Sequence, residues 1–81
     1  MSDFIERLRI EKQELDDKIG NLKAFMEGDE FKLLDRVQQS LMQVQSHAML
    51  TYSQILFARI ERLNRDLEMY AKYPKATATD S

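Results

Sequence analysis

The sequence predicts an all-α protein folded as a long helical hairpin. Its 81 residues include only two Gly and one Pro and are rich in strong helix formers such as Leu, Glu, Lys, Arg, Gln and Met. Apolar residues recur at intervals of three and four along two segments, which is the spacing of a helix with one buried face. No segment shows the alternating pattern of a strand.

The first helix is predicted over about residues 3–27. Asp3 followed by Glu6 resembles a capping box, and an acidic side chain suits the start of a helix. Gly28 can take the left-handed conformation that closes a helix. The apolar face of this segment consists of Phe4, Leu8, Leu15, Leu22 and Phe25, with Ile5, Ile19 and Met26 beside them.

A short turn over 29–34 and a second helix over about 36–72 follow. Asp35 with Gln38 three residues later is a second capping signal, and the next helix breaker is Pro74. We therefore expect one domain over 1–73. Residues 74–81 have nothing to bury, and we expect this tail to be disordered.

The second helix carries more apolar surface than the first helix can cover. At 1.5 Å per residue it would be roughly 55 Å long, against about 36 Å for the first helix. Either another subunit covers the excess or the helix bends, and the polar cluster around Ser46 and Ser53 is the expected place for a bend. Two heptad series mark its apolar face: Met42, Met49, Leu56, Leu63 and Tyr70, and Leu34, Leu41, Ala48 and Ile55.

Between Val37 and Ala58 there are 22 residues without a single Asp, Glu, Lys or Arg. The length would suit a membrane span, but about ten Gln, Ser, Thr and His side chains in the stretch are too polar for hydrocarbon. A helix that excludes charge but keeps neutral polar groups fits the inside of an assembly. Small domains of this size often depend on oligomerisation for stability, so we expect a homo-oligomer.

Composition excludes several other classes. The chain has no Cys, which removes disulfides and thiolate metal sites, and no signal peptide or apolar anchor is evident, so a cytoplasmic location is expected. Residues 1–30 carry nine acids and five bases, and residues 31–81 carry five acids and seven bases. This mild asymmetry does not fit a duplex nucleic-acid binder.

Residues able to perform catalysis are scarce. His47 is the only histidine, and without a second His or a Cys it is better interpreted as a structural imidazole than as a metal ligand. Glu11, Glu14, Asp16 and Asp17 fit a solvated helix face. No glycine-rich loop, nucleophile elbow or paired-carboxylate motif is present. We expect no enzymatic activity, no metal and no cofactor.

One basic edge remains as a candidate for ligand binding. Arg59, Arg62 and Arg65 lie on successive turns of the second helix, and their forked donors could bind phosphate. The alternative is ordinary pairing with carboxylates three or four residues away on the same helix. Those carboxylates are Glu61, Asp66 and Glu68.

The pattern of both helices resembles a known protein family. The residues that carry the resemblance are Phe4-x-x-Arg7-x-x-x-Glu11-x-x-x-Leu15-x-x-Lys18-Ile19-x-x-Leu22-x-x-Phe25, then Phe31-x-x-Leu34, then Leu41-x-x-x-Gln45-x-x-x-Met49-x-x-Tyr52-x-x-x-Leu56-x-x-Arg59-Ile60. This pattern is similar to the helical-hairpin domain of phage anti-defence sponges, namely the anti-CBASS cyclic-oligonucleotide sponge and the hairpin shared with the Thoeris-inhibiting sponge. It covers about residues 3 to 63.

The resemblance implies a non-enzymatic protein that binds cyclic di- or trinucleotide immune messengers inside the infected bacterial cell and withholds them from their effector. Members of the family form helical homo-oligomers, commonly hexamers. Their pockets for cyclic dinucleotides lie between subunits, and cyclic trinucleotides occupy separate pockets.

The resemblance also implies candidate residues for each pocket. For cyclic dinucleotides, Lys23 matches a phosphate-binding lysine, and Leu8 stands where a base-stacking aromatic is expected, with Phe4 or Tyr52 of a neighbouring chain as substitutes. For cyclic trinucleotides the matching arginine is Arg59. Tyr52 belongs to the same set, and Glu6 and Arg7 complete it from another subunit.

Two other functions are compatible with the residues. A structural or adaptor hairpin would use the apolar face to bind a protein partner and would bind no nucleotide. An RNA-binding hairpin would use Arg59, Arg62 and Arg65, but the acidic first helix and the net charge of −2 oppose it.

Overall fold

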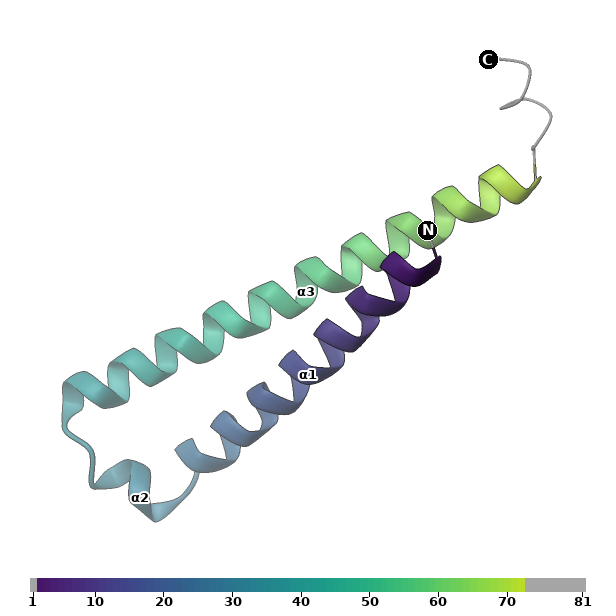
Figure 1. Ribbon diagram of the computed structural model, residues 1–81. Helices are drawn as coiled ribbons and strands as arrows, with labels where there is room; N and C mark the ends of the chain where they lie inside the picture. The colour runs from purple at the N-terminus through teal and green to yellow at the C-terminus, as the bar shows by residue number, and fades with distance from the viewer. Residues whose placement is uncertain (1, 73–81) are drawn as a thin grey trace.

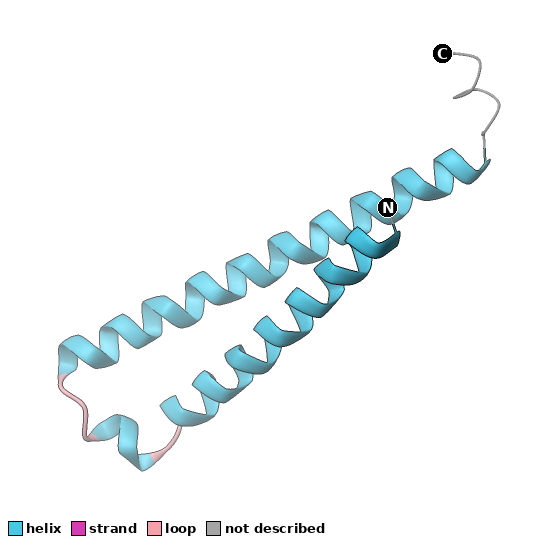
Figure 2. Ribbon diagram, in the orientation of Figure 1, coloured by secondary structure: helices cyan, strands magenta, loops and turns pink. Residues whose placement is uncertain are grey.

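A computed structural model describes residues 2–72, which form two long antiparallel helices joined by a short third helix (Figure 1). The helices are α1 (Ser2–Met26), α2 (Asp29–Lys32) and α3 (Arg36–Lys72). Figure 2 shows no strand in this part of the chain. The predicted all-α hairpin is therefore confirmed, with dimensions of 64 × 17 × 14 Å. The expected disordered tail, 74–81, lies outside the described residues.

The first helix begins and ends within a residue of the prediction, although its two end signals act differently. Because α1 begins at Ser2, Asp3 lies inside the first turn and is not the cap; its carboxylate still suits the positive end of the helix dipole. The prediction of a left-handed Gly28 is wrong. Its φ of −92° and ψ of 174° are extended, and no described residue has a positive φ.

Hydrogen bonds of the last turn end α1 instead. The amide of Gly28 donates to the carbonyl oxygen of Phe25 at 3.0 Å, and Gly28 then leads in extended conformation into α2. Tight bonds of this kind satisfy terminal carbonyl groups without a left-handed residue. The predicted turn over 29–34 thus contains the single-turn helix α2.

The second capping prediction is confirmed. The Asp35 carboxylate accepts a hydrogen bond of 2.8 Å from the backbone amide of Gln38, as an N-cap residue should. The next residue, Gln39, donates its side-chain amide to the carbonyl oxygens of Phe31 and Leu34, at 3.1 and 3.0 Å. These bonds hold α2 and the residues that follow it against the start of α3.

The core is a narrow apolar seam between α1 and α3. Leu56 is completely buried at its centre, and Leu8 is 4% exposed. The heptad series that contains Leu56 faces α1, whereas Leu41, Ala48 and Ile55 of the other series are exposed. The seam consists of Ile5, Leu8, Leu15, Leu56 and Ile60, with Ile19, Met49, Leu63 and Leu67 packed against it.

The long helix does not break to compensate for its extra length. It runs without interruption from Arg36 to Lys72 and continues past the start of α1 (Figure 1). Within the expected bend region, Ser53 bonds across to α1 rather than back to its own preceding turn. Neither long helix has a segment apolar enough to cross a bilayer, as judged over the described residues.

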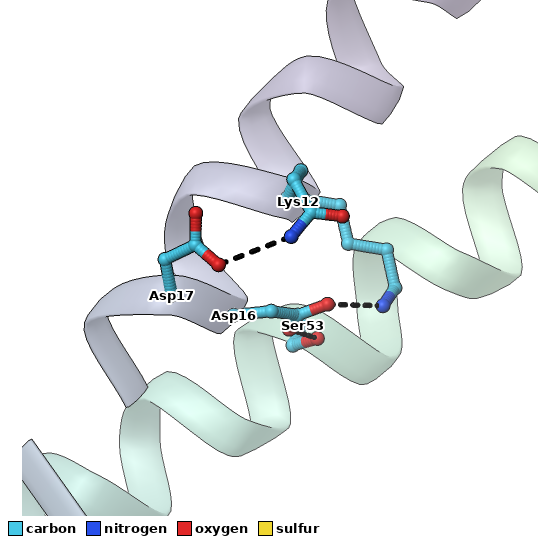
Figure 3. Close-up of polar contacts among 5 residues, drawn as sticks. Lys12, Asp16, Asp17 and Ser53 are labelled. Carbon is cyan, nitrogen blue, oxygen red and sulfur yellow. Dashed lines mark hydrogen bonds and ion pairs between the residues drawn. The ribbon is translucent and has the colours of Figure 1, made fainter. Parts of the chain in front are cut away.

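A polar contact interrupts the apolar seam. The Ser53 hydroxyl, 6% exposed, donates a hydrogen bond of 2.5 Å to Asp16, whose other carboxylate oxygen lies 2.7 Å from Lys12 Nζ (Figure 3). Asp16, whose side chain is 38% exposed, thus reaches α3 from the edge of the solvated face to which the sequence pattern assigned it. The bond from Lys12, followed by that from Ser53, lowers the pKa of Asp16 below 3.8.

Truncation of the seam should destabilise the hairpin strongly. Leu56→Ala removes a completely buried side chain and should reduce the free energy of unfolding by about 2–5 kcal/mol, through lost burial and a residual cavity. Leu33→Ala is the control, because Leu33 is 84% exposed. Urea unfolding followed by circular dichroism measures both. Equal small losses would show that Leu56 is not at the centre of the core.

The Asp16 contact should make stability depend on acid. Its pKa is lowered on folding, so its contribution is complete above about pH 3.8 and is lost as pH falls through the lowered value. Asp16→Asn should therefore cost stability at pH 7, and the difference from wild type should shrink below pH 4. Asp17→Asn is the control, because Asp17 accepts a bond from Gln13 of its own helix. A difference that is constant from pH 7 to pH 2 would refute this role.

Candidate functional site

A groove opens where the start of α1 lies beside the second half of α3. Its volume is about 430 Å³. Phe4 provides the α1 side, and α3 provides the rest. The lining is mostly apolar, with two guanidinium groups, and consists of Phe4, Ile55, Ala58, Arg59, Arg62 and Leu63.

Antiparallel packing explains how these residues meet. On α3, positions 55, 59 and 62 are separated by four and three residues, so they follow one side of the helix. Ile5 and Leu8 hold the start of α1 against this part of α3. Phe4, next to Ile5 but 39% exposed, lies at the edge of the seam and faces the groove.

The two arginines of the groove differ in their partners. Arg62 Nε lies 3.4 Å from Asp66 Oδ1, whereas Arg59 forms no ion pair within the described part of the chain. Of the pairings that the sequence allowed among Glu61, Asp66 and Glu68, only this one with Asp66 is present among the described residues. Guanidinium groups above an apolar floor suit a ligand with both anionic and flat apolar parts.

Of the residues predicted for cyclic trinucleotides, Arg59 lines the groove, whereas Glu6, Arg7 and Tyr52 do not. Tyr52 precedes Arg59 by seven residues, which is two turns or about 10 Å along the same side of α3. Arg7 follows Phe4 by three residues and shares its side of α1. The side chains of Tyr52 and Arg7 are exposed. Glu6 is also exposed, but it is two residues from Phe4 and so points to a different side.

The predicted cyclic dinucleotide set is not assembled in one chain. Leu8 is part of the buried seam. Lys23 is exposed near the other end of α1, about 28 Å from Phe4 along the helix axis. Phe4 instead lines the groove with Arg59, a residue assigned to the other pocket. A site that uses both Phe4 and Lys23 therefore needs two chains.

Sequence reasoning did not assign four residues of the groove: Ile55, Ala58, Arg62 and Leu63. Ile55 and Leu63 were recognised only as members of heptad series, and Arg62 only as part of a basic edge. One feature of the sequence could nevertheless have indicated the groove. Along one side of α3 the uncharged stretch ends at Ala58, and arginines begin at Arg59.

A second hollow, of about 520 Å³, follows the part of α3 beyond the groove. It is lined by α3 alone, so no second element encloses a ligand there. Its two carboxylates also make it less suitable for an anion than the groove. Its residues are Glu61, Asn64, Arg65, Leu67 and Glu68.

Two further features of the described residues concern His47 and the side chains that could bind a metal ion. His47 is exposed on α3. No group of three or more His, Asp or Glu side chains gathers there in a way that could hold a metal ion.

The structure is a helical hairpin with an open groove lined by apolar side chains and two arginines. A family model described as Sequestin matches residues 2–62, and the chain belongs to the Sequestin family. The match covers α1, α2 and α3 as far as Arg62, and it includes every residue that lines the groove except Leu63. Comparison with curated proteins and with solved structures gives no match. The family name indicates a sequestering function, in agreement with the resemblance to sponge proteins.

Proposed function

We propose that this protein is a phage anti-defence sponge that binds cyclic oligonucleotide second messengers and releases them unchanged. The observation that carries the proposal is the groove, in which an aromatic side chain and an apolar floor adjoin Arg59 and Arg62. Membership of the Sequestin family supports sequestration as the purpose of binding.

The groove matches the chemistry of such a ligand. A cyclic oligonucleotide combines phosphodiester groups with flat bases. Guanidinium groups bind phosphate through paired hydrogen bonds, and aromatic rings stack on bases. In this proposal Arg59 binds a phosphate, Phe4 packs against a base, and Tyr52 and Arg7 contact the parts of the ligand that extend beyond the groove.

The groups that line the groove support binding without cleavage. Hydrolysis of a phosphodiester needs a general base, a nucleophile or a bound metal. The groove offers apolar side chains and two arginines, and a guanidinium group stays protonated and cannot act as a base. The proposed role is therefore to lower the free concentration of the messenger.

Arg59, which the resemblance assigns to cyclic trinucleotides, lines this groove, and this supports cyclic trinucleotides as its ligands. Tyr52 and Arg59 lie on one side of α3, and Arg7 shares the side of α1 that carries Phe4. A separate cyclic dinucleotide pocket built around Lys23 would lie between chains.

We also propose that copies of the chain assemble through an exposed apolar stripe on α3. Its members follow the three- and four-residue spacing of a coiled-coil seam, and all lie in the stretch without charge. An exposed apolar face of this kind typically marks an interaction site. The resemblance suggests a hexamer in the cytoplasm of the infected cell. The α3 stripe consists of Val37, Leu41, Val44, Ala48 and Ile55.

The same stripe supports the second candidate function, an adaptor that binds a protein partner. An adaptor would keep the stripe exposed until that partner arrives and would not need the groove. The two functions are separated by the oligomeric state of the purified protein and by nucleotide binding.

Arg59 should be required for ligand binding. Arg59→Ala removes charge-assisted hydrogen bonds to phosphate and should weaken the binding of cyclic triadenylate by about 1.5–3 kcal/mol. Arg65→Ala removes the same charge from α3 outside the groove and is the control. Titration calorimetry measures both affinities, and chromatography of heat-released ligand should return cyclic triadenylate intact. Unchanged affinity in a folded Arg59→Ala protein, or linear products, would contradict the proposal.

The stripe should control assembly. Leu41→Glu places a carboxylate on the α3 stripe and should reduce the mass measured by light scattering, while helix content persists because Leu41 is 57% exposed in the single chain. Gln43→Glu adds the same charge to another side of α3 and should leave the mass unchanged. A wild-type protein that is monomeric at micromolar concentration would show that the stripe does not join copies.

A further inference from the structure

Arg62 occupies a position equivalent to that of Arg59 at the groove. It follows Arg59 by three residues, so the two side chains lie on adjacent turns of one side of α3. Both line the groove, with Ile55, Ala58 and Leu63 as their apolar neighbours. A ligand whose phosphate reaches Arg59 is therefore within one helical turn of Arg62.

A carboxylate outside the groove already engages Arg62. Asp66 does not line the groove, and its Oδ1 lies 3.4 Å from Arg62 Nε. Arg59 has no such partner among the described residues. Both arginines line the groove, but only Arg62 has a carboxylate of the same helix that competes for its guanidinium group.

The pair is weak enough for a ligand to replace it. The side chains of Arg62 and Asp66 are 73% and 53% exposed, and the contact uses a single nitrogen, Nε. Exposed ion pairs of this kind contribute little to stability. A phosphate can instead accept two parallel bonds from one guanidinium group, which is the stronger arrangement.

We propose that Arg62 is the second phosphate-binding residue of the groove and that Asp66 limits ligand affinity by competing for it. This inference rests on the proposed function of the groove. Ligand binding moves Arg62 from Asp66 to the phosphate, and Asp66 remains nearby as an uncompensated negative charge. Asp66 thereby limits the affinity for the messenger, although it does not contact the messenger itself.

Four variants test the competition with cyclic triadenylate in titration calorimetry. Asp66→Asn should increase the affinity about two- to fivefold, because the amide no longer pairs with Arg62. Glu68→Gln makes the same change of charge on α3 outside the groove, and its effect should be smaller. Arg62→Ala should reduce the affinity about tenfold.

The double variant Arg62→Ala/Asp66→Asn separates competition from general repulsion. If Asp66 acts through Arg62, the double variant should bind like Arg62→Ala, with no gain from the added Asn. An equal gain from Asp66→Asn with and without Arg62 would overturn the competition, and wild-type affinity in Arg62→Ala would overturn the phosphate role. In both cases wild type still binds and the proposed function stands. A folded wild-type protein that binds no cyclic nucleotide would refute both.

Discussion

Two helices can bury only the stripes that face each other, and this constraint shapes the whole protein. The stripe centred on Leu56 closes against α1, and the flanks of α3 stay exposed among residues 2–72. The greater length of α3 increases this uncovered surface, because α3 continues past the start of α1. Every feature with a possible function, the groove and the α3 stripe alike, lies on surface that the hairpin leaves uncovered.

The polar contact within the seam favours the register that forms the groove. Apolar seams tolerate sliding, because one leucine can take the place of another one turn away. The hydrogen bond between Asp16 and the buried Ser53 hydroxyl is made only when these two residues face each other, so it favours the observed register. Phe4 lies about 18 Å from Asp16 along α1, and Arg62 about 14 Å from Ser53 in the same direction, so this register brings both to the groove.

The groove adjoins the end of the stripe, and Ile55 belongs to both. Along this side of α3 the surface therefore changes from apolar to basic within one turn, at Ala58 and Arg59. A surface of this kind can join copies of the chain through its apolar part and leave its basic end for an anionic ligand. An adaptor function would explain the stripe but would give no reason for the arginines that follow it.

The sequence by itself determined the helices and the family. Apolar spacing, few breakers and the Asp35 cap act within one or two turns, so the bounds of α1 and α3 were predictable to about a residue. Only tertiary structure decided which side of each helix is covered. The heptad pattern showed two apolar series on α3 and did not say which one is buried. Packing against α1 buried the series that contains Leu56. It buried Leu8, brought Asp16 to Ser53 and brought Phe4 to Arg59. These outcomes depend on contacts between residues far apart in the chain, which local spacing does not specify.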